Sequence, residues 1–126
     1  MLSRERTQAI AQEWIDAWNG HNIDVIMSYY ADNIEFSSPF VVKLTGDPKG
    51  ILNGKAALRV YFLKALAAYP KLRFKIRHVF GGVNTMVVHY WSVKNMAASE
   101  VMVLNEQGKI VKTEARYSPD PFIEKQ

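Results

Sequence analysis

Glu100 is the residue best placed in the sequence for acid or base chemistry. It alternates with Met102 and Leu104 in a segment typical of a strand, so its carboxyl group should lie among apolar neighbours on the inner face of a sheet. Removal from water disfavours the carboxylate, raises its pKa and keeps part of the acid protonated near neutral pH, which suits general acid or base catalysis. The alternative is a carboxylate at the start of the strand that reaches solvent or pairs with Lys or Arg.

His78 is the second catalytic candidate, because its parity places it on the same inner face, where it could relay a proton to or from Glu100. A single histidine on an apolar face is more often a hydrogen-bonded core residue. His89 has the opposite parity and His21 lies in a predicted turn, so no metal site is predicted. The chain has no cysteine and no phosphate-binding or dinucleotide loop, and we therefore expect no cofactor.

Aromatic residues, a few of them tyrosines, are spread so that many should face one cavity. Core packing is their simplest role, but convergent hydroxyl groups in an apolar cavity also suit a small, largely apolar ligand. The predicted pocket residues are Trp14, Trp18, Tyr30, Phe36, Ser38, Tyr61, Phe62, Phe74, Tyr90, Ser92, Met102 and Tyr117. A triad of Ser38 with His78 and Glu100 can be drawn, but no nucleophile elbow surrounds the serine.

Helices that come first and strands that follow should position these residues. The predicted helices span about 10–19, 23–30 and 55–69, and the predicted strands span about 34–38, 71–80, 84–94, 97–105 and 109–117. Gly20 separates the first two helices, residues 31–33 break the second, and Pro39 ends the first strand or fixes it at an edge. This order predicts an α+β domain with three helices packed on one face of a curved, mainly antiparallel sheet.

The 126 residues, 48% of them apolar and 22% charged, suit a single domain over 1–126, with a loose tail at 119–126. No stretch is long and apolar enough to span a membrane, and the start of the chain lacks the apolar core of a secretory signal, so we expect a cytoplasmic protein. The net charge of +4 permits an acidic partner. Nucleic acid is disfavoured, because Phe74 has the opposite parity to the basic residues around it and should point inward.

Strands 84–94 and 97–105 are apolar on both faces, although helices should cover only one of them. A second subunit on the outer face would explain this pattern, and a few exposed apolar residues are the simpler alternative. We therefore expect a homodimer through the face that bears Val87, His89, Trp91, Val101 and Val103.

The element order, with WIDAWNGHNIDVIMSYYADNIEFSSP early and NEQGKIVKTEARY late, resembles the nuclear-transport-factor-2-like superfamily, in particular its SnoaL-like and ketosteroid-isomerase-like members. The resemblance covers about residues 7–118. It implies a cone-shaped half-barrel with a deep apolar pocket, often paired back to back through the sheets. It also implies a small-molecule protein that isomerises, cyclises or dehydrates its ligand by cofactor-free acid–base chemistry, or a non-catalytic binding or interaction module of the same fold.

Ketosteroid isomerisation itself is disfavoured. Under this resemblance, Trp14 stands at the oxyanion tyrosine, Ser38 at the base and Glu100 at the protonated aspartate. An indole N–H donates a hydrogen bond but transfers no proton near neutral pH, and an unassisted serine is a very poor base. The Asp-Arg-Asp set of limonene-epoxide-hydrolase-like relatives is also missing, because the corresponding positions hold Tyr90, Ser92 and Ala115.

Overall fold

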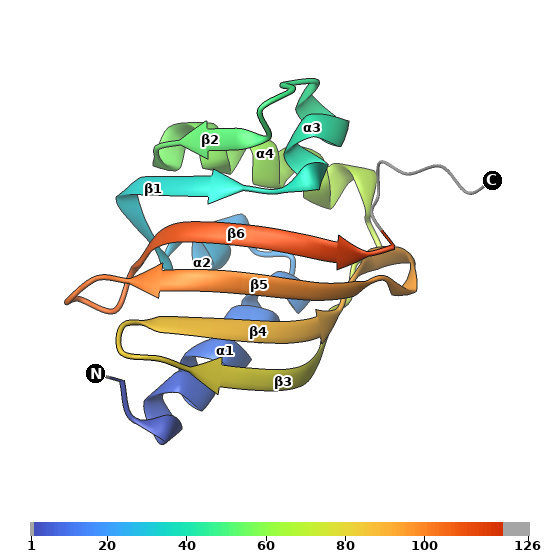
Figure 1. The fold of residues 1–126 in the computed structure, drawn as a ribbon. Helices are drawn as coiled ribbons and strands as arrows, with labels where there is room; N and C mark the ends of the chain where they lie inside the picture. The colour runs from blue at the N-terminus through green and yellow to red at the C-terminus, as the bar shows by residue number, and fades with distance from the viewer. Residues whose placement is uncertain (1, 120–126) are drawn as a thin grey trace.

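Helices cover one face of a six-stranded curved sheet in the computed structural model, which describes residues 2–119 (Figure 1). The helices are α1 (Arg4–Asn19), α2 (Ile23–Met27), α3 (Pro39–Thr45) and α4 (Lys55–Ala68), and the short 3-10 helix η1 spans Val93–Asn95. The strands are β1 (Tyr30–Ser37), β2 (Ile51–Asn53), β3 (Lys75–Gly81), β4 (Thr85–Trp91), β5 (Ala97–Leu104) and β6 (Ile110–Ser118). The predicted α+β class with helices on a curved sheet is confirmed.

The strand order is β2-β1-β6-β5-β4-β3, and every neighbouring pair is antiparallel except β1 with β6. Helices α1 and α2 lie behind the sheet in Figure 1, and the opposite face of β3 to β6 carries no helix. Side chains on the helix side of β4 and β5 are buried, whereas those on the other side remain partly or largely exposed. The predicted parity of these two strands is therefore confirmed. No helix of the described residues has the length and apolar character needed to cross a membrane.

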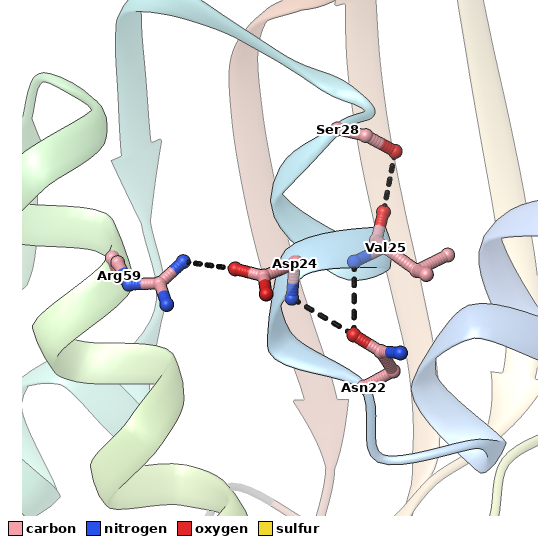
Figure 2. A network of polar contacts seen from close by, with 5 residues as sticks. All are labelled: Asn22, Asp24, Val25, Ser28 and Arg59. Atoms are coloured by element: carbon pink, nitrogen blue, oxygen red, sulfur yellow. Dashed lines mark hydrogen bonds and ion pairs between the residues drawn. The ribbon is translucent and has the colours of Figure 1, made fainter.

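Helix ends are set by polar side chains that accept from free backbone N–H groups. Ser3 Oγ accepts from Arg6 N at 3.0 Å, so α1 begins six residues before the apolar stripe that predicted it. Asn22 Oδ1 accepts from the backbone N–H groups of Asp24 and Val25 at the start of α2 (Figure 2). The Arg59–Asp24 ion pair, 2.8 Å long, joins α4 to α2 but is too exposed to contribute much stability.

The segment 31–45 differs from its prediction. Residues 31–33 do not break a helix but belong to β1, and the chain after β1 forms α3 instead of a loop. Pro39 begins this helix, because a first helical residue needs no N–H and proline has the right φ angle already. Ser38 caps α3 by accepting from Phe40 N at 3.1 Å. The short strand β2 was not predicted either, since its pairing with β1 has no local signal.

A bulge in β3 overturns the prediction for His78. Ile76 pairs with Tyr90 but His78 pairs with His89, so one extra residue enters the β3 strand between them. That insertion reverses the parity of the residues that follow. His78 and Phe80 are exposed, and Val79 is the residue that packs against the core. His78 therefore does not share the inner face with Glu100, and the predicted proton relay between them is wrong.

Candidate functional site

A cavity of about 50 Å³, measured as the space open to the centres of water molecules, lies between the helices and the inner sheet face. All the predicted pocket residues line it except Ser38 and Met102. The lining is formed by Trp14, Trp18, Tyr30, Phe36, Phe40, Leu44, Tyr61, Phe62, Ala65, Tyr69, Leu72, Phe74, Tyr90, Ser92, Val93, Glu100 and Tyr117. This space holds a few water molecules or a ligand of similar size.

Two predicted pocket residues have other positions. Met102 is completely buried in the core, two residues beyond Glu100 on β5. Ser38 is buried at the start of α3, close enough to Tyr61 and Tyr117 for its hydroxyl group to lower the pKa of each phenol. Phe40 and Leu44 line the cavity but were not predicted, because they come from α3, whose apolar spacing is too short to distinguish from a strand or loop.

Glu100 is placed in the cavity by the register of β5. Its neighbours across the sheet are Val88 on β4 and Ala115 on β6, both of which face the core. The methyl group of Ala115 leaves more room beside the carboxyl group than any larger apolar side chain would. Glu100 is 3% exposed, which agrees with its predicted burial and contradicts the alternative in which it reaches solvent.

The carboxyl group of Glu100 has one protein hydrogen-bond partner among residues 2–119. Tyr90 Oη donates to Glu100 Oε1 over 2.7 Å, and the bond is buried. None of the ion pairs formed by the described residues includes Glu100. Burial raises the pKa of Glu100 to about 7, and the hydrogen bond from Tyr90 only partly opposes it. Near neutral pH the group is therefore divided between its acid and base forms.

Four tyrosines around the cavity remain protonated near neutral pH. Burial raises the pKa of Tyr30, Tyr61, Tyr90 and Tyr117, and the negative charge of Glu100 raises each of them further. These phenols can donate and accept hydrogen bonds but do not act as bases near neutral pH. Among these groups, Glu100 is the one whose pKa lies near neutral pH.

The helix side of the cavity carries two indoles, one turn apart on α1. Trp14 Nε1 donates to Tyr30 Oη over 3.0 Å, and the Trp14 ring packs edge-on to Tyr90 at 5.4 Å between ring centres. Trp18 packs edge-on to Phe62 at 4.7 Å. The end of α1 is held in place by Asn19, whose side chain exchanges two hydrogen bonds with the backbone of Phe74, 2.6 and 2.9 Å long.

A wider surface hollow of about 480 Å³ adjoins the cavity, with which it shares Tyr69, Leu72, Ser92 and Val93. The exposed Lys71, Arg73 and Lys94 stand around this hollow. A ligand that reaches the cavity from this side therefore passes through positive potential. Within the described residues, no three His, Asp or Glu side chains are grouped as metal ligands would be.

Comparisons with known proteins agree with the architecture. The protein-family model that describes the SnoaL-like domain matches residues 11–113 of this chain. A SnoaL-like protein of unknown function from Burkholderia thailandensis E264 is 38% identical, with 91% of this chain and 96% of that chain covered and a TM-score of 0.87. A comparison with curated protein sequences gives no match.

Two more distant structures share the fold alone. An NTF2-like protein of unknown function from Cytophaga hutchinsonii is 20% identical over 98% of this chain and 100% of that one, with a TM-score of 0.71. SalBIII, an epoxide hydrolase/cyclase-like enzyme with a role in pyran ring formation in the polyether salinomycin, is 19% identical over 95% and 97%, with a TM-score of 0.75.

Proposed function

Because the chain belongs to the SnoaL-like domain family, we propose that its cavity binds a small, largely apolar molecule and that Glu100 exchanges a proton with that molecule without a cofactor. The observation that carries the proposal is the buried Glu100–Tyr90 pair on the cavity wall. Near neutral pH such a carboxyl group is present both as a base and as an acid. General acid–base catalysis is most efficient when the pKa of the catalytic group lies near the working pH. Isomerisation, cyclisation and dehydration are the reaction classes that such an exchange supports.

A ketone with exchangeable hydrogens is the simplest test of this chemistry. Glu100 as a carboxylate would take a proton from the carbon beside the carbonyl; the electron pair of that C–H bond would form a C=C bond, and the π pair of the carbonyl would move onto its oxygen to give an enolate. Return of a deuteron from D₂O to the same carbon completes the exchange. Butanone is a suitable probe because it is small enough for the cavity with little movement of the lining.

We expect the protein to accelerate hydrogen–deuterium exchange of butanone above the buffer rate, and Glu100→Gln to remove about 10²- to 10⁴-fold of the acceleration. Proton NMR of butanone in D₂O measures both rates. His78→Gln is the matched control, because the exposed His78 lies outside the cavity and its loss should leave the rate unchanged. Equal acceleration by the natural chain and Glu100→Gln would contradict the assignment.

The second candidate is a binding module of the same fold without catalytic activity. The small volume of the cavity favours it, since aromatic side chains from α1, α4 and the sheet occupy most of the space. Ligand binding without any exchange above the buffer rate, in both the natural chain and Glu100→Gln, would support this candidate over the first.

We also propose a homodimer through the uncovered sheet face, with a second copy of the chain as the partner. Trp91 is 42% exposed there, with Arg77 stacked on its ring at 4.5 Å, and the partly exposed Val87, Val101 and Val103 extend the apolar surface. Trp91→Glu should yield a monomer, measured by sedimentation. A stable monomer of the natural chain at tens of micromolar, where a Kd of about 1 μM would leave mostly dimer, would contradict the proposal.

A further inference from the structure

The surface hollow beside the cavity is lined by positive charge alone. Lys71, Arg73 and Lys94 are exposed and line it, and no Asp or Glu is among its lining residues. None of the ion pairs formed by residues 2–119 includes any of these three side chains. Within the described residues, the three charges are therefore not neutralised by a carboxylate and are open to a solute in the hollow.

The hollow borders the apolar cavity directly. Tyr69, Leu72, Ser92 and Val93 line both spaces. Leu72 and Ser92 are buried, whereas Tyr69 and Val93 are partly exposed and belong to the rim. A molecule that occupies both spaces would therefore place its apolar part against the aromatic lining of the cavity and its polar end among three cations.

The backbone that carries two of these cations is held in place. Lys71 and Arg73 stand on either side of the buried Leu72, so one short segment supplies both the apolar wall and the charges. His21 Nε2 donates to Leu72 O over 2.7 Å, because a carbonyl oxygen can only accept. Leu72 N donates to Tyr69 O over 2.9 Å. These bonds fix the positions from which the two cationic side chains extend.

The third cation stands on a turn that does not favour lysine. Met96 N donates to Val93 O over 3.2 Å, and the two residues between them, Lys94 and Asn95, have φ angles of 55° and 57°. Asparagine tolerates this left-handed conformation, whereas a long side chain such as lysine rarely adopts it. The chain thus carries a lysine where asparagine or glycine would fold more easily, and that lysine lines the hollow.

We propose that Lys71, Arg73 and Lys94 bind the anionic head group of the ligand, so that the natural ligand is a small organic acid whose apolar part enters the cavity. This inference rests on the proposed function and names the class of molecule that Glu100 would act on. A carboxylate or a phosphate forms charge-assisted hydrogen bonds with Lys and Arg, which a neutral molecule cannot do. A hollow lined by charges of one sign also concentrates solutes of the opposite sign.

The test compares an acid with its neutral ester. 4-Oxopentanoate is butanone extended by a carboxylate, and its methyl ester has nearly the same shape without the charge; 6-oxoheptanoate and its methyl ester allow a longer distance between head group and carbonyl. Binding to the ¹⁵N-labelled Glu100→Gln chain is measured by NMR titration at pH 7.5, where the probe carboxylates are ionised. We expect at least one acid to bind about 10-fold more tightly than its own ester, and 0.5 M NaCl to remove most of this preference.

Lys94→Asn should weaken binding of that acid about 2- to 5-fold, the size expected for one exposed ion pair, and leave the ester unaffected. Because asparagine suits the turn, this variant should be at least as resistant to urea as its parent, so that unfolding cannot explain the loss. Lys71→Gln, Arg73→Gln and Lys94→Asn together should remove the preference for the acid. Lys49→Asn is the matched control: it makes the same change of charge at an exposed lysine that lines neither space, and it should alter neither affinity.

Butyl phosphate and pentanoate distinguish the two kinds of head group, since the tighter binder identifies the anion that the hollow accepts. Equal affinity of each acid and its ester, no binding of either acid, or an equal loss in Lys94→Asn and Lys49→Asn would overturn the head-group site. Because binding is measured in Glu100→Gln, selective binding of the acid without hydrogen exchange in the natural chain would overturn the catalytic proposal alone. Exchange of butanone without any preference for the acid would overturn the head-group site alone.

Discussion

Glu100→Gln should remove a fall in stability that the natural chain shows between about pH 4.5 and pH 7. Gln has nearly the shape of Glu and can still accept from Tyr90, so the variant loses the titration and little of the packing. Burial is the cause of the raised pKa, about 7 in the folded chain against an ordinary value of 4.5. That difference corresponds to about 3 kcal/mol of stability.

The direction of this change in stability with pH follows from whether the folded or the unfolded chain holds the proton of Glu100. Below about pH 4.5 the carboxyl group is protonated in the folded and unfolded chains alike. Between about 4.5 and 7 the unfolded chain releases the proton that the folded chain still holds, so each increase in pH favours unfolding. Above about 7 the group is ionised in both states and the loss is complete.

Urea denaturation of the two proteins at a series of pH values measures this effect. The difference in the free energy of unfolding between Glu100→Gln and the natural chain should increase by about 3 kcal/mol in favour of the variant from pH 4.5 to pH 8. Glu114→Gln is a suitable control, because this partly exposed carboxylate pairs with Arg116 on the outer face. A constant difference between the natural chain and Glu100→Gln would show that Glu100 titrates as an exposed acid.

Trp14→Ala should destabilise the protein by about 3–5 kcal/mol, the usual cost of removing a large buried aromatic side chain. Trp14 is 1% exposed and packs against Phe74 and Tyr90. The variant also leaves Tyr30 Oη without its donor. The expected loss is a large part of the whole stability of a domain of this size.

Trp14→Phe separates packing from the hydrogen bond. It keeps an aromatic ring in the core and removes the indole N–H, so it should cost clearly less than Trp14→Ala. The midpoint of urea unfolding gives both losses, and a loss below about 1 kcal/mol for Trp14→Ala would contradict the placement of Trp14 in a packed core. Indole added to Trp14→Ala should recover part of the stability if the vacated space remains open.

Some residues around the cavity stabilise the folded chain, and others lower its stability. Aromatic packing around Trp14 and Phe62 contributes stability, whereas the buried carboxyl group of Glu100 and the unpaired N–H of Trp18 reduce it. Groups that are retained at such a cost are typical of functional sites, because selection for stability alone would replace them.

The sequence by itself determined the class of fold and the place of Glu100. Apolar residues recur at helical spacing in 10–19 and 55–69, and they alternate between the two faces in 84–91 and 97–104. Both patterns are local, because they depend only on the backbone geometry of each helix or strand. The inner position of Glu100 followed from that alternation, since the residues around it pair with β4 and β6 without interruption.

Only the tertiary structure decided the partners of these residues. The bulge between Ile76 and His78 reverses the parity of β3, and it exists because of how β3 pairs with β4, which no local pattern encodes. The helix α3 is too short for periodicity to define, so Phe40 and Leu44 were missed. The hydrogen bond from Trp14 to Tyr30 joins side chains of α1 and β1, and the N–H of Trp18 on α1 has no partner within residues 2–119. Whether two such groups form a hydrogen bond depends on the distance between them in the folded chain, which their spacing in the sequence does not give.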